Sequence, residues 1–276
     1  MIKRILVGLD GSSYSKSASQ LASMMAKKND GVVVGVASLD IRGIERSMGP
    51  VPLGGSYFAE QVIDLKFQKE EKKIKGYLNE FEHFCQENQV KYELVFRVGV
   101  PSEQLIEEGK TADVIILGLQ TYFRFDSMPG NTLKKLMKSG VCPIIAVPEH
   151  INTFYNVLIA YDGSLGSAKA MRSFVQLANS LSVANKLVLV NINDNNSIGK
   201  KLLDEAQKYL AAYGLSVQQH LCSGEPKEKI YEIAQDMQPT LIVIGNFGNS
   251  KLQDLMWGST TSYFVNIGDI PLLVHH

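Results

Sequence analysis

The stretch Ile5-Leu-Val-Gly-Leu-Asp-Gly-Ser12 decides the fold, because it returns in similar form as Val157-Leu-Ile-Ala-Tyr-Asp-Gly-Ser164. In each copy an apolar run typical of a buried strand ends at Asp-Gly-Ser, and a helical stretch rich in small residues follows. Such self-similarity within a chain of 276 residues predicts that one structural unit occurs twice.

Three later landmarks repeat in the same order, which makes chance similarity a poor explanation. They are Gly99-Val-Pro101 with Gly224-Glu-Pro226, Asp113-Val-Ile-Ile-Leu-Gly118 with Thr240-Leu-Ile-Val-Ile-Gly245, and Cys142-Pro-Ile-Ile-Ala-Val147 with Ile270-Pro-Leu-Leu-Val-His275. The short polar segment Pro148–Tyr155 separates the copies. We therefore predict two domains, residues 1–150 and 151–276.

The first copy is longer than the second between its first two landmarks. Asp10 and Asp162 lie 152 positions apart, but Gly99 and Gly224 lie only 125 apart, so the first copy holds 27 additional residues. We place them at about residues 40–61, where Met48-Gly-Pro-Val-Pro-Leu-Gly-Gly55 indicates an inserted irregular loop.

Apolar β-branched runs alternate with segments of helical period in both copies. Because the predicted strands are apolar on both sides, we expect helices on both faces of the sheet. The predicted fold class is α/β: two tandem open parallel five-stranded sheets flanked by helices, with right-handed crossovers. The strands are Ile2–Leu9, Gly31–Ser38, Tyr92–Val98, Val114–Leu117 and Ile144–Val147, then Asn156–Tyr161, Lys186–Ile192, Ser216–Cys222, Leu241–Ile244 and Leu272–His275; the clearest helices are Phe58–Glu87, Pro101–Lys110, Ile198–Tyr213 and Pro226–Gln238.

Composition excludes several classes of protein. The chain has 28 basic residues (Lys and Arg) and 28 acidic residues (Asp and Glu), so its formal net charge is zero. A balanced charge argues against a basic nucleic-acid-binding protein. No apolar run is long enough for a membrane span, and no signal-peptide stretch follows Met1. Three scattered cysteines without a CxxC pair are typical of reduced thiols, so we expect a cytoplasmic protein.

Open α/β sheets bind ligands at the carboxyl ends of their strands. Elements of the second copy that are predicted to lie there are Asp162-Gly-Ser164, Asn191-Ile-Asn193 and Gly245-Asn-Phe-Gly248 with its continuation Gly258-Ser-Thr-Thr261. We expect Gly245 and Gly248 to let the backbone take left-handed angles and approach a ligand closely. Amides and hydroxyls at the start of a helix, predicted over Ser262–Ile267, would hold phosphate oxygens.

The spacing Gly245-x2-Gly248-x9-Gly258-Ser259 resembles the ATP-binding signature of the universal stress protein family. The Asp-Gly-Ser after the opening strand and the Ile-Pro before the closing strand also agree with that family. Since the similarity runs through both copies, the chain resembles a tandem universal stress protein. The resemblance implies the adenine nucleotide alpha hydrolase-like variant of the Rossmann-like fold.

The resemblance also implies a ligand and the residues that hold it. The ligand is ATP or another adenine nucleotide, with Mg²⁺ or Mn²⁺ held by its phosphates. Asp162 would lie beside the adenine with the backbone of Ala160 and Tyr161, Ile192 would pack on the base, Gly245 and Gly248 would line the ribose and phosphates, and Gly258, Ser259, Thr260 and Thr261 would bind the phosphates. The last strands of the two domains would pair within the chain, and a homodimer of whole chains stays open.

The first copy departs from this signature. Thr121 stands where the second glycine is expected, only eight residues then precede Gly130, and Asn131 replaces the serine. A β-carbon at Thr121 disfavours positive φ. We therefore expect the first domain to bind nucleotide weakly or not at all.

Plainer interpretations remain for the same residues. The glycines can be turn residues, and Asp162 can be no more than an Asx turn or a helix cap. We prefer a nucleotide-responsive binding module of stress adaptation without a dedicated catalytic activity. The alternatives are a nucleotide-dependent enzyme with slow ATP hydrolysis and a structural or dimerising protein that binds no nucleotide. No catalytic residue or metal-ligand cluster is predicted, and no histidine is expected beside a candidate serine.

Overall fold

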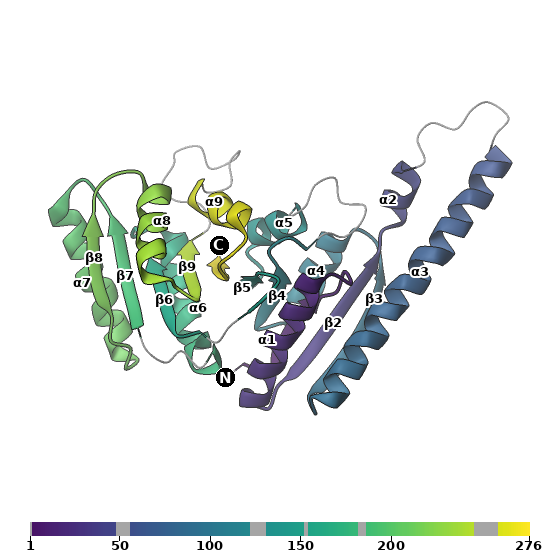
Figure 1. Cartoon of the computed structure of the whole chain (residues 1–276), viewed down its shortest axis with the longest axis horizontal. Helices are drawn as coiled ribbons and strands as arrows, with labels where there is room; N and C mark the ends of the chain where they lie inside the picture. Colours follow the sequence, from purple (N-terminus) through teal and green to yellow (C-terminus); the bar gives the residue numbers. More distant parts are fainter. Residues whose placement is uncertain (1, 48–55, 122–130, 152–153, 182–185, 246–258) are drawn as a thin grey trace.

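The computed structural model of the chain describes residues 2–47, 56–121, 131–151, 154–181, 186–245 and 259–276. Its strands form one ten-stranded sheet in the order β3-β2-β1-β4-β5-β10-β9-β6-β7-β8. Figure 1 shows the two halves of the chain side by side, with the two last strands, β5 and β10, at the centre. The predicted α/β class is confirmed, and the two predicted sheets are joined into one.

The first half contains the elements β1 to β5. In chain order they are β1 Arg4–Gly8, α1 Ser13–Asn29, β2 Val32–Leu39, α2 Ile41–Arg46, α3 Ser56–Glu87, β3 Lys91–Val98, α4 Pro101–Gly109, β4 Val114–Gly118, α5 Asn131–Ser139 and β5 Ile144–Val147.

The second half repeats the order without a counterpart of α2. Its elements are β6 Asn156–Ala160, α6 Leu165–Leu181, β7 Lys186–Ile192, α7 Asn196–Ala212, β8 Gln218–Cys222, α8 Pro226–Met237, β9 Leu241–Gly245, α9 Ser259–Ile267 and β10 Leu272–His275. Local sequence explains several helix starts. Ser12 and Ser164 accept the amides of Ser15 and Ser167 at 3.2 Å, and proline opens both α4 and α8.

The halves meet through their last strands. Among the described strands all neighbouring pairs are parallel except β5 with β10, which run antiparallel with Ile145 opposite Leu273. Both of these side chains are fully buried. The sheet therefore contains, within one chain, the contact between last strands that the resemblance implies.

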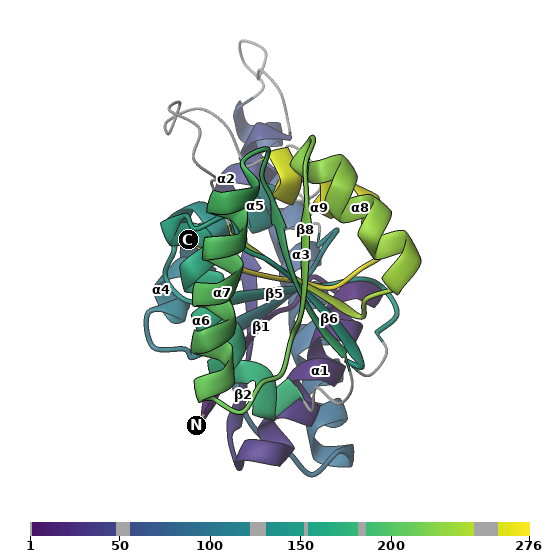
Figure 2. The same cartoon turned by 90° about the vertical axis from the view of Figure 1, so that its left-hand side faces the viewer.

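Helices cover both faces of the sheet and enclose two apolar layers. Helices α1, α3, α6 and α7 bury one layer, and α4, α5, α8 and α9 bury the other. Figure 2 shows α7 on one side of β8 and α8 with α9 on the opposite side. This arrangement leaves the carboxyl ends of the strands as the edge at which loops from both faces meet.

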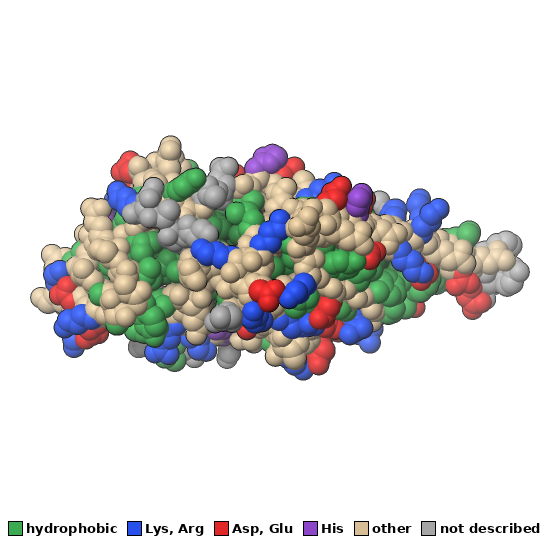
Figure 3. Space-filling view, turned by 90° about the horizontal axis from the view of Figure 1, so that it is seen from below, with side chains coloured by type: hydrophobic (Ala, Val, Ile, Leu, Met, Phe, Trp, Pro, Cys, Tyr) green, Lys and Arg blue, Asp and Glu red, His purple; other side chains and the backbone are tan. Residues whose placement is uncertain are grey.

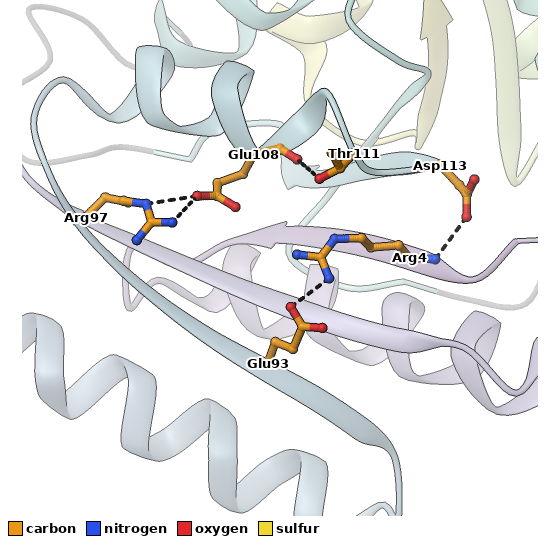
Figure 4. A network of polar contacts seen from close by, with 6 residues as sticks. All are labelled: Arg4, Glu93, Arg97, Glu108, Thr111 and Asp113. Carbon is orange, nitrogen blue, oxygen red and sulfur yellow. Dashed lines mark hydrogen bonds and ion pairs between the residues drawn. The ribbon is translucent and has the colours of Figure 1, made fainter.

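The edge strand β3 differs from the expectation that every strand is buried on both faces. Leu94 and Val98 are 38% and 49% exposed, since α3 covers one face of β3 only in part. On the other face Glu93 pairs with Arg4 at 2.6 Å, and Arg97 pairs with Glu108 of α4 at 2.7 Å (Figure 4). These ion pairs join the edge of the sheet to β1 and α4.

Parts of the segment at about 40–61, where we expected the inserted loop, are helical, because α2 covers Ile41–Arg46 and α3 begins at Ser56. Asp40 caps α2 by accepting the amide of Gly43 at 2.9 Å. Helix α3 already begins at Ser56 and has 32 residues, against 17 in α7. Residues 48–55 lie outside the described residues. Figure 1 shows α3 reaching beyond the sheet beside α2.

Two exclusions made from composition can be compared with the structure. None of the helices in the described part of the chain has the length and apolar character needed to cross a bilayer. On the face shown in Figure 3, which is the lower side of Figure 1, basic and acidic side chains are interspersed. That face therefore offers no patch of a single charge.

Candidate functional site

The carboxyl ends of β9, β6 and β7 form the candidate site, because these strands are neighbours in the sheet. The chain leaves β6 toward β7 on one side, whereas β9 lies on the other, so this is the point where the strand order reverses. Asp162 follows β6, Ile192 ends β7 and Gly245 ends β9. The structure thus brings these three predicted residues to one end of three adjacent strands.

Ala160 and Ile192 form a small apolar shelf at this end. Both side chains are only half-buried, and both pack against the core layer under α8 and α9. Ala160 pairs with Val190 in the register, so Ile192 lies two residues further along the neighbouring strand and on the same face. A flat apolar group can rest on this shelf without displacing a core residue.

The backbone of Tyr161 is held on both sides. Its amide donates to the carbonyl of Val190 at 2.9 Å, and its carbonyl accepts from Nδ2 of Asn191 at 2.6 Å. Asn191 is 1% exposed. The Tyr161 ring packs on the opposite face, toward α7, where burial raises the pKa of its phenol. The backbone amide and carbonyl of Tyr161 are thus held in place at the site, while its ring packs in the apolar layer under α6 and α7.

Asp162 is exposed and uses one carboxylate oxygen locally. That oxygen accepts the amide of Ser164 at 2.9 Å, which is the Asx turn of the plainer interpretation. The second oxygen has no hydrogen-bond donor among the described residues. The local role and a ligand role are therefore compatible.

Gly245 is required by packing and not by a left-handed angle. Its φ is not among the positive values of the described glycines. A β-carbon at this position would lie 2.4 Å from the backbone nitrogen of Ser167, at the first turn of α6. The expectation of left-handed backbone at Gly245 is wrong, and the absent side chain instead lets the end of β9 approach the start of α6.

The start of α9 lies at this end of β9, as expected for a phosphate-binding helix, although α9 begins at Ser259, three residues before the prediction. Thr260 is half-buried. Thr261 is fully buried and donates its hydroxyl to the Gly245 carbonyl at 3.1 Å, so this hydroxyl ties α9 to β9. Gly248, Gly258 and the side chain of Ser259 lie outside the described residues.

The equivalent place in the first half carries larger side chains. A β-carbon at Gly118 would lie 2.3 Å from Cβ of Tyr14, whereas Gly166 occupies the position of Tyr14 in the second half. Thr121 is 2% exposed and is not among the described residues with positive φ. Its hydroxyl has no hydrogen-bond partner among the described residues. The first half therefore has the side chain of Tyr14 at a point where the second half, with Gly166, has no side chain.

One polar pair was missed by the sequence analysis. Oγ of Ser173 on α6 lies 2.7 Å from Nδ1 of His275 on β10, although no histidine was expected beside a serine. The two residues are 102 positions apart, so no local motif could reveal them. Burial, followed by the positive charges of Lys169 and His276, lowers the pKa of His275. Ser173 is only 3% exposed and His275 is half-buried, so the pair ties α6 to β10 at the edge of the core.

Within the residues that the structure describes, no group of three or more His, Cys, Asp or Glu side chains could hold a metal ion.

Comparison with known proteins identifies both halves. The model of the universal stress protein family matches residues 1–148 and again residues 153–276. Universal stress protein Slr1230 of Synechocystis is 26% identical, and the alignment covers 99% of each chain. Universal stress protein YxiE of Bacillus subtilis is 28% identical over 44% of this chain but 98% of its own length, so that relative corresponds to a single half.

A solved structure extends the comparison to the fold. The crystal structure of a universal stress protein from Archaeoglobus fulgidus matches 98% of this chain and 97% of its own, with a TM-score of 0.69 at 18% identity. At that identity the likeness concerns the fold alone. The two matches of the family model, which cover almost the whole chain, show that it belongs to the universal stress protein family.

Proposed function

We propose that the second half of this chain binds ATP or another adenine nucleotide at the ends of β6, β7 and β9. One observation carries the proposal: a half-exposed apolar shelf, an exposed carboxylate and the start of a nine-residue helix lie around the point where the strand order reverses. Universal stress protein membership of both halves supports it.

Each part of the site suits one part of the nucleotide. The adenine ring packs on Ala160 and Ile192, and the free oxygen of Asp162 accepts a hydrogen bond from the adenine amino group. The phosphates lie at the start of α9, where the amides of the first turn have no partner within the helix. Gly248, Gly258, Ser259 and Thr260 supply backbone and hydroxyl groups there, and the phosphates carry Mg²⁺ or Mn²⁺ when a metal is bound.

The first half does not bind nucleotide in this proposal. Tyr14 fills the space beside Gly118, and Thr121 replaces a glycine in the loop that follows. The two halves thus form one nucleotide-binding domain and one related domain in which that site is closed.

Matched aspartates test the proposal. Asp10 and Asp162 both accept the amide of the serine two residues on, at 2.9 Å, so Asp→Ala removes the same turn in either half. We expect calorimetric titration with ATP and Mg²⁺ to show about tenfold weaker binding in Asp162→Ala, which corresponds to about 1.4 kcal/mol. Asp10→Ala should bind as the unaltered chain does. Equal affinity in Asp162→Ala and the unaltered chain would contradict the site.

The cellular role we propose is a nucleotide-responsive binding module in stress adaptation. Bound nucleotide fixes the segment between Gly248 and Gly258, and this changes the surface presented to partners. Trypsin cleavage after Lys251 measures the effect. Saturating ATP should slow that cleavage while cleavage at the exposed Lys201 of α7 continues unchanged. Identical rates at Lys251 with and without ATP would count against a nucleotide-dependent surface.

A further inference from the structure

A cavity of about 270 Å³ opens between α1 and α3 in the first half, on the face of the sheet opposite α4 and α5. Its floor and one wall are apolar and aromatic: Leu9, Tyr77, Phe81 and Phe84. The opposite wall is the face of α1 that carries Ser15 and Ser19. An apolar cavity of about 150 Å³ is enough to hold benzene, so this one has room for a substituted aromatic ring.

Two glycines create the space for the aromatic wall. A β-carbon at Gly11, where φ is 75°, would lie 2.2 Å from the ring of Tyr77. A β-carbon at Gly35 in β2 would lie 2.6 Å from the ring of Phe81. The rings are therefore seated directly against backbone, and this fixes the wall that they form.

The corresponding place in the second half is filled. Helices α1 and α6 align without a gap, so Met171 stands where the first half has Ser19, and it is 5% exposed in the core. In the strand register Leu189 stands where the first half has Gly35. The first half thus has the small Ser19 in the cavity wall where the second half has Met171, and Gly35 lets the Phe81 ring take the place that Leu189 occupies in the second half.

The rim carries one charge of each sign. Lys16 and Glu80 line the cavity from α1 and α3, and both side chains are exposed. Neither has an ion-pair partner among the described residues. The polar atoms of the α1 wall are already used, because Ser15 and Ser19 donate to the carbonyls of Ser12 and Ser15 at 2.9 and 2.8 Å. The polar groups left for a ligand are therefore the two charges at the rim, the amide of Gln20 and the phenol of Tyr77, and only the first two carry charge.

We propose that the cavity between α1 and α3 binds a small aromatic zwitterion, with its ring against Tyr77, Phe81 and Phe84, its carboxylate at Lys16 and its ammonium group at Glu80. The ring is buried by stacking and edge contacts with the aromatic wall, which favour such a ligand beyond simple area burial. The two exposed charges contribute orientation more than affinity. This site is separate from the nucleotide site in both its half of the chain and its ligand.

L-phenylalanine is the probe that tests the proposal on the full chain, with binding followed by calorimetry and by ligand-detected NMR. We expect saturable binding at one site per chain. Ser19→Met copies the second half and fills the cavity, so binding should weaken at least about tenfold, or about 1.4 kcal/mol. Lys16→Ala and Glu80→Gln should each weaken binding roughly threefold, as expected for exposed ion pairs.

Ser23→Val is the matched control, since it copies Val175 of the second half one turn further along α1 and outside the cavity lining. It should bind phenylalanine as the unaltered chain does. ATP binding should be the same in all of these variants, so failure of this proposal can be told from failure of the nucleotide site.

Two related compounds test the charges separately. 3-Phenylpropionate lacks the ammonium group and phenethylamine lacks the carboxylate, so each should bind roughly threefold more weakly than phenylalanine. No saturable phenylalanine binding, or unchanged binding in Ser19→Met, would overturn the site. Equal affinity for either related compound would overturn the zwitterion assignment.

Discussion

The two halves of the chain share a framework but differ where a ligand would bind. In both, a glycine ends the strand before the candidate loop and packs on the helix after the first strand, at Gly118 and at Gly245. The nearest atoms on that helix are Cβ of Tyr14 in the first half and the backbone of Gly166 and Ser167 in the second. In both halves the glycine is therefore needed for close packing on this helix, and the halves differ in the side chain that the helix carries at that point.

The opposite change in side-chain size occurred further along α1, where it faces α3. Ser19 lines a cavity in the first half, whereas Met171 occupies the corresponding position in the second and is buried. The two halves thus differ in side-chain size at corresponding positions of α1 and α6. If both proposed sites exist, a few such changes give the two halves different ligands.

The largest expected effect is a loss of stability when either of the two packed glycines, Gly118 or Gly245, is replaced. Gly118→Ala and Gly245→Ala each place a β-carbon within 2.4 Å of a neighbouring atom. Overpacking of this kind should lower the free energy of unfolding by about 3 kcal/mol in either variant. Urea denaturation measures both. A loss below about 1 kcal/mol in one variant alone would show that the two glycines do not have the same role.

The second prediction tests whether the side chain beside Gly118 and Gly245, which is Tyr14 in one half and absent at Gly166 in the other, decides nucleotide binding. Gly166→Tyr copies Tyr14 into the second half and should weaken ATP binding about tenfold, or about 1.4 kcal/mol, because the side chain starts at the base of the site. Tyr14→Gly alone should not create a second site, since Thr121 remains in the first half. Calorimetry detects both results, and unchanged affinity in Gly166→Tyr would contradict the steric explanation.

A third effect compares one helix glycine from each half. A β-carbon at Gly76 in α3 meets nothing within 4 Å, so Gly76→Ala should stabilise the protein by about 0.5–1 kcal/mol. At Gly199 in α7 the β-carbon would lie 2.5 Å from Leu221 and 2.9 Å from Asn191, so Gly199→Ala should destabilise it by about 1 kcal/mol. Shifts of the same sign in urea denaturation would contradict the packing difference.

The smallest effect concerns pH. The pKa of His275 lies below its ordinary value of 6.5, chiefly because the ring is partly buried. As pH falls below about 6.5, the unfolded chain takes up a proton that the folded chain resists, so stability decreases until the lower folded pKa is passed. Thermal unfolding between pH 7.5 and 5.5 should show this loss.

The first half supplies the control for that measurement, because Leu21 and Val147 occupy the positions of Ser173 and His275. The double variant Ser173→Leu with His275→Val should lose less stability over the same pH range. His276 keeps its own lowered pKa and with it part of the slope. An unchanged pH dependence would show that His275 does not cause it.

The elements of the fold could be predicted from local patterns. Strands β5, β7 and β10 begin and end where the apolar runs do, and prolines mark the starts of α4 and α8. The Gly- and Pro-rich stretch 48–55 indicated a loop, and this concealed the early start of α3 at Ser56. The exposure of β3 was also missed, because the position of a strand within a sheet is not encoded in the strand itself.

The candidate site could be predicted in position but not in detail. Asp162, Ile192 and Gly245 were expected at strand ends, and the structure places them there. The reason for Gly245 was missed because its packing partner Ser167 lies in another element. The burial of Thr261 was missed for the same reason, since its hydroxyl bonds to Gly245 across the end of the sheet. Such contacts depend on tertiary packing, which no local spacing records.

The number of nucleotides bound per chain tests the central claim most directly. Native mass spectrometry of the full chain titrated with ATP and Mg²⁺ would resolve each bound molecule. Our account predicts that one ATP binds per chain and that a second does not follow at higher concentration. No bound nucleotide, or two sites filled with equal affinity, would contradict the account.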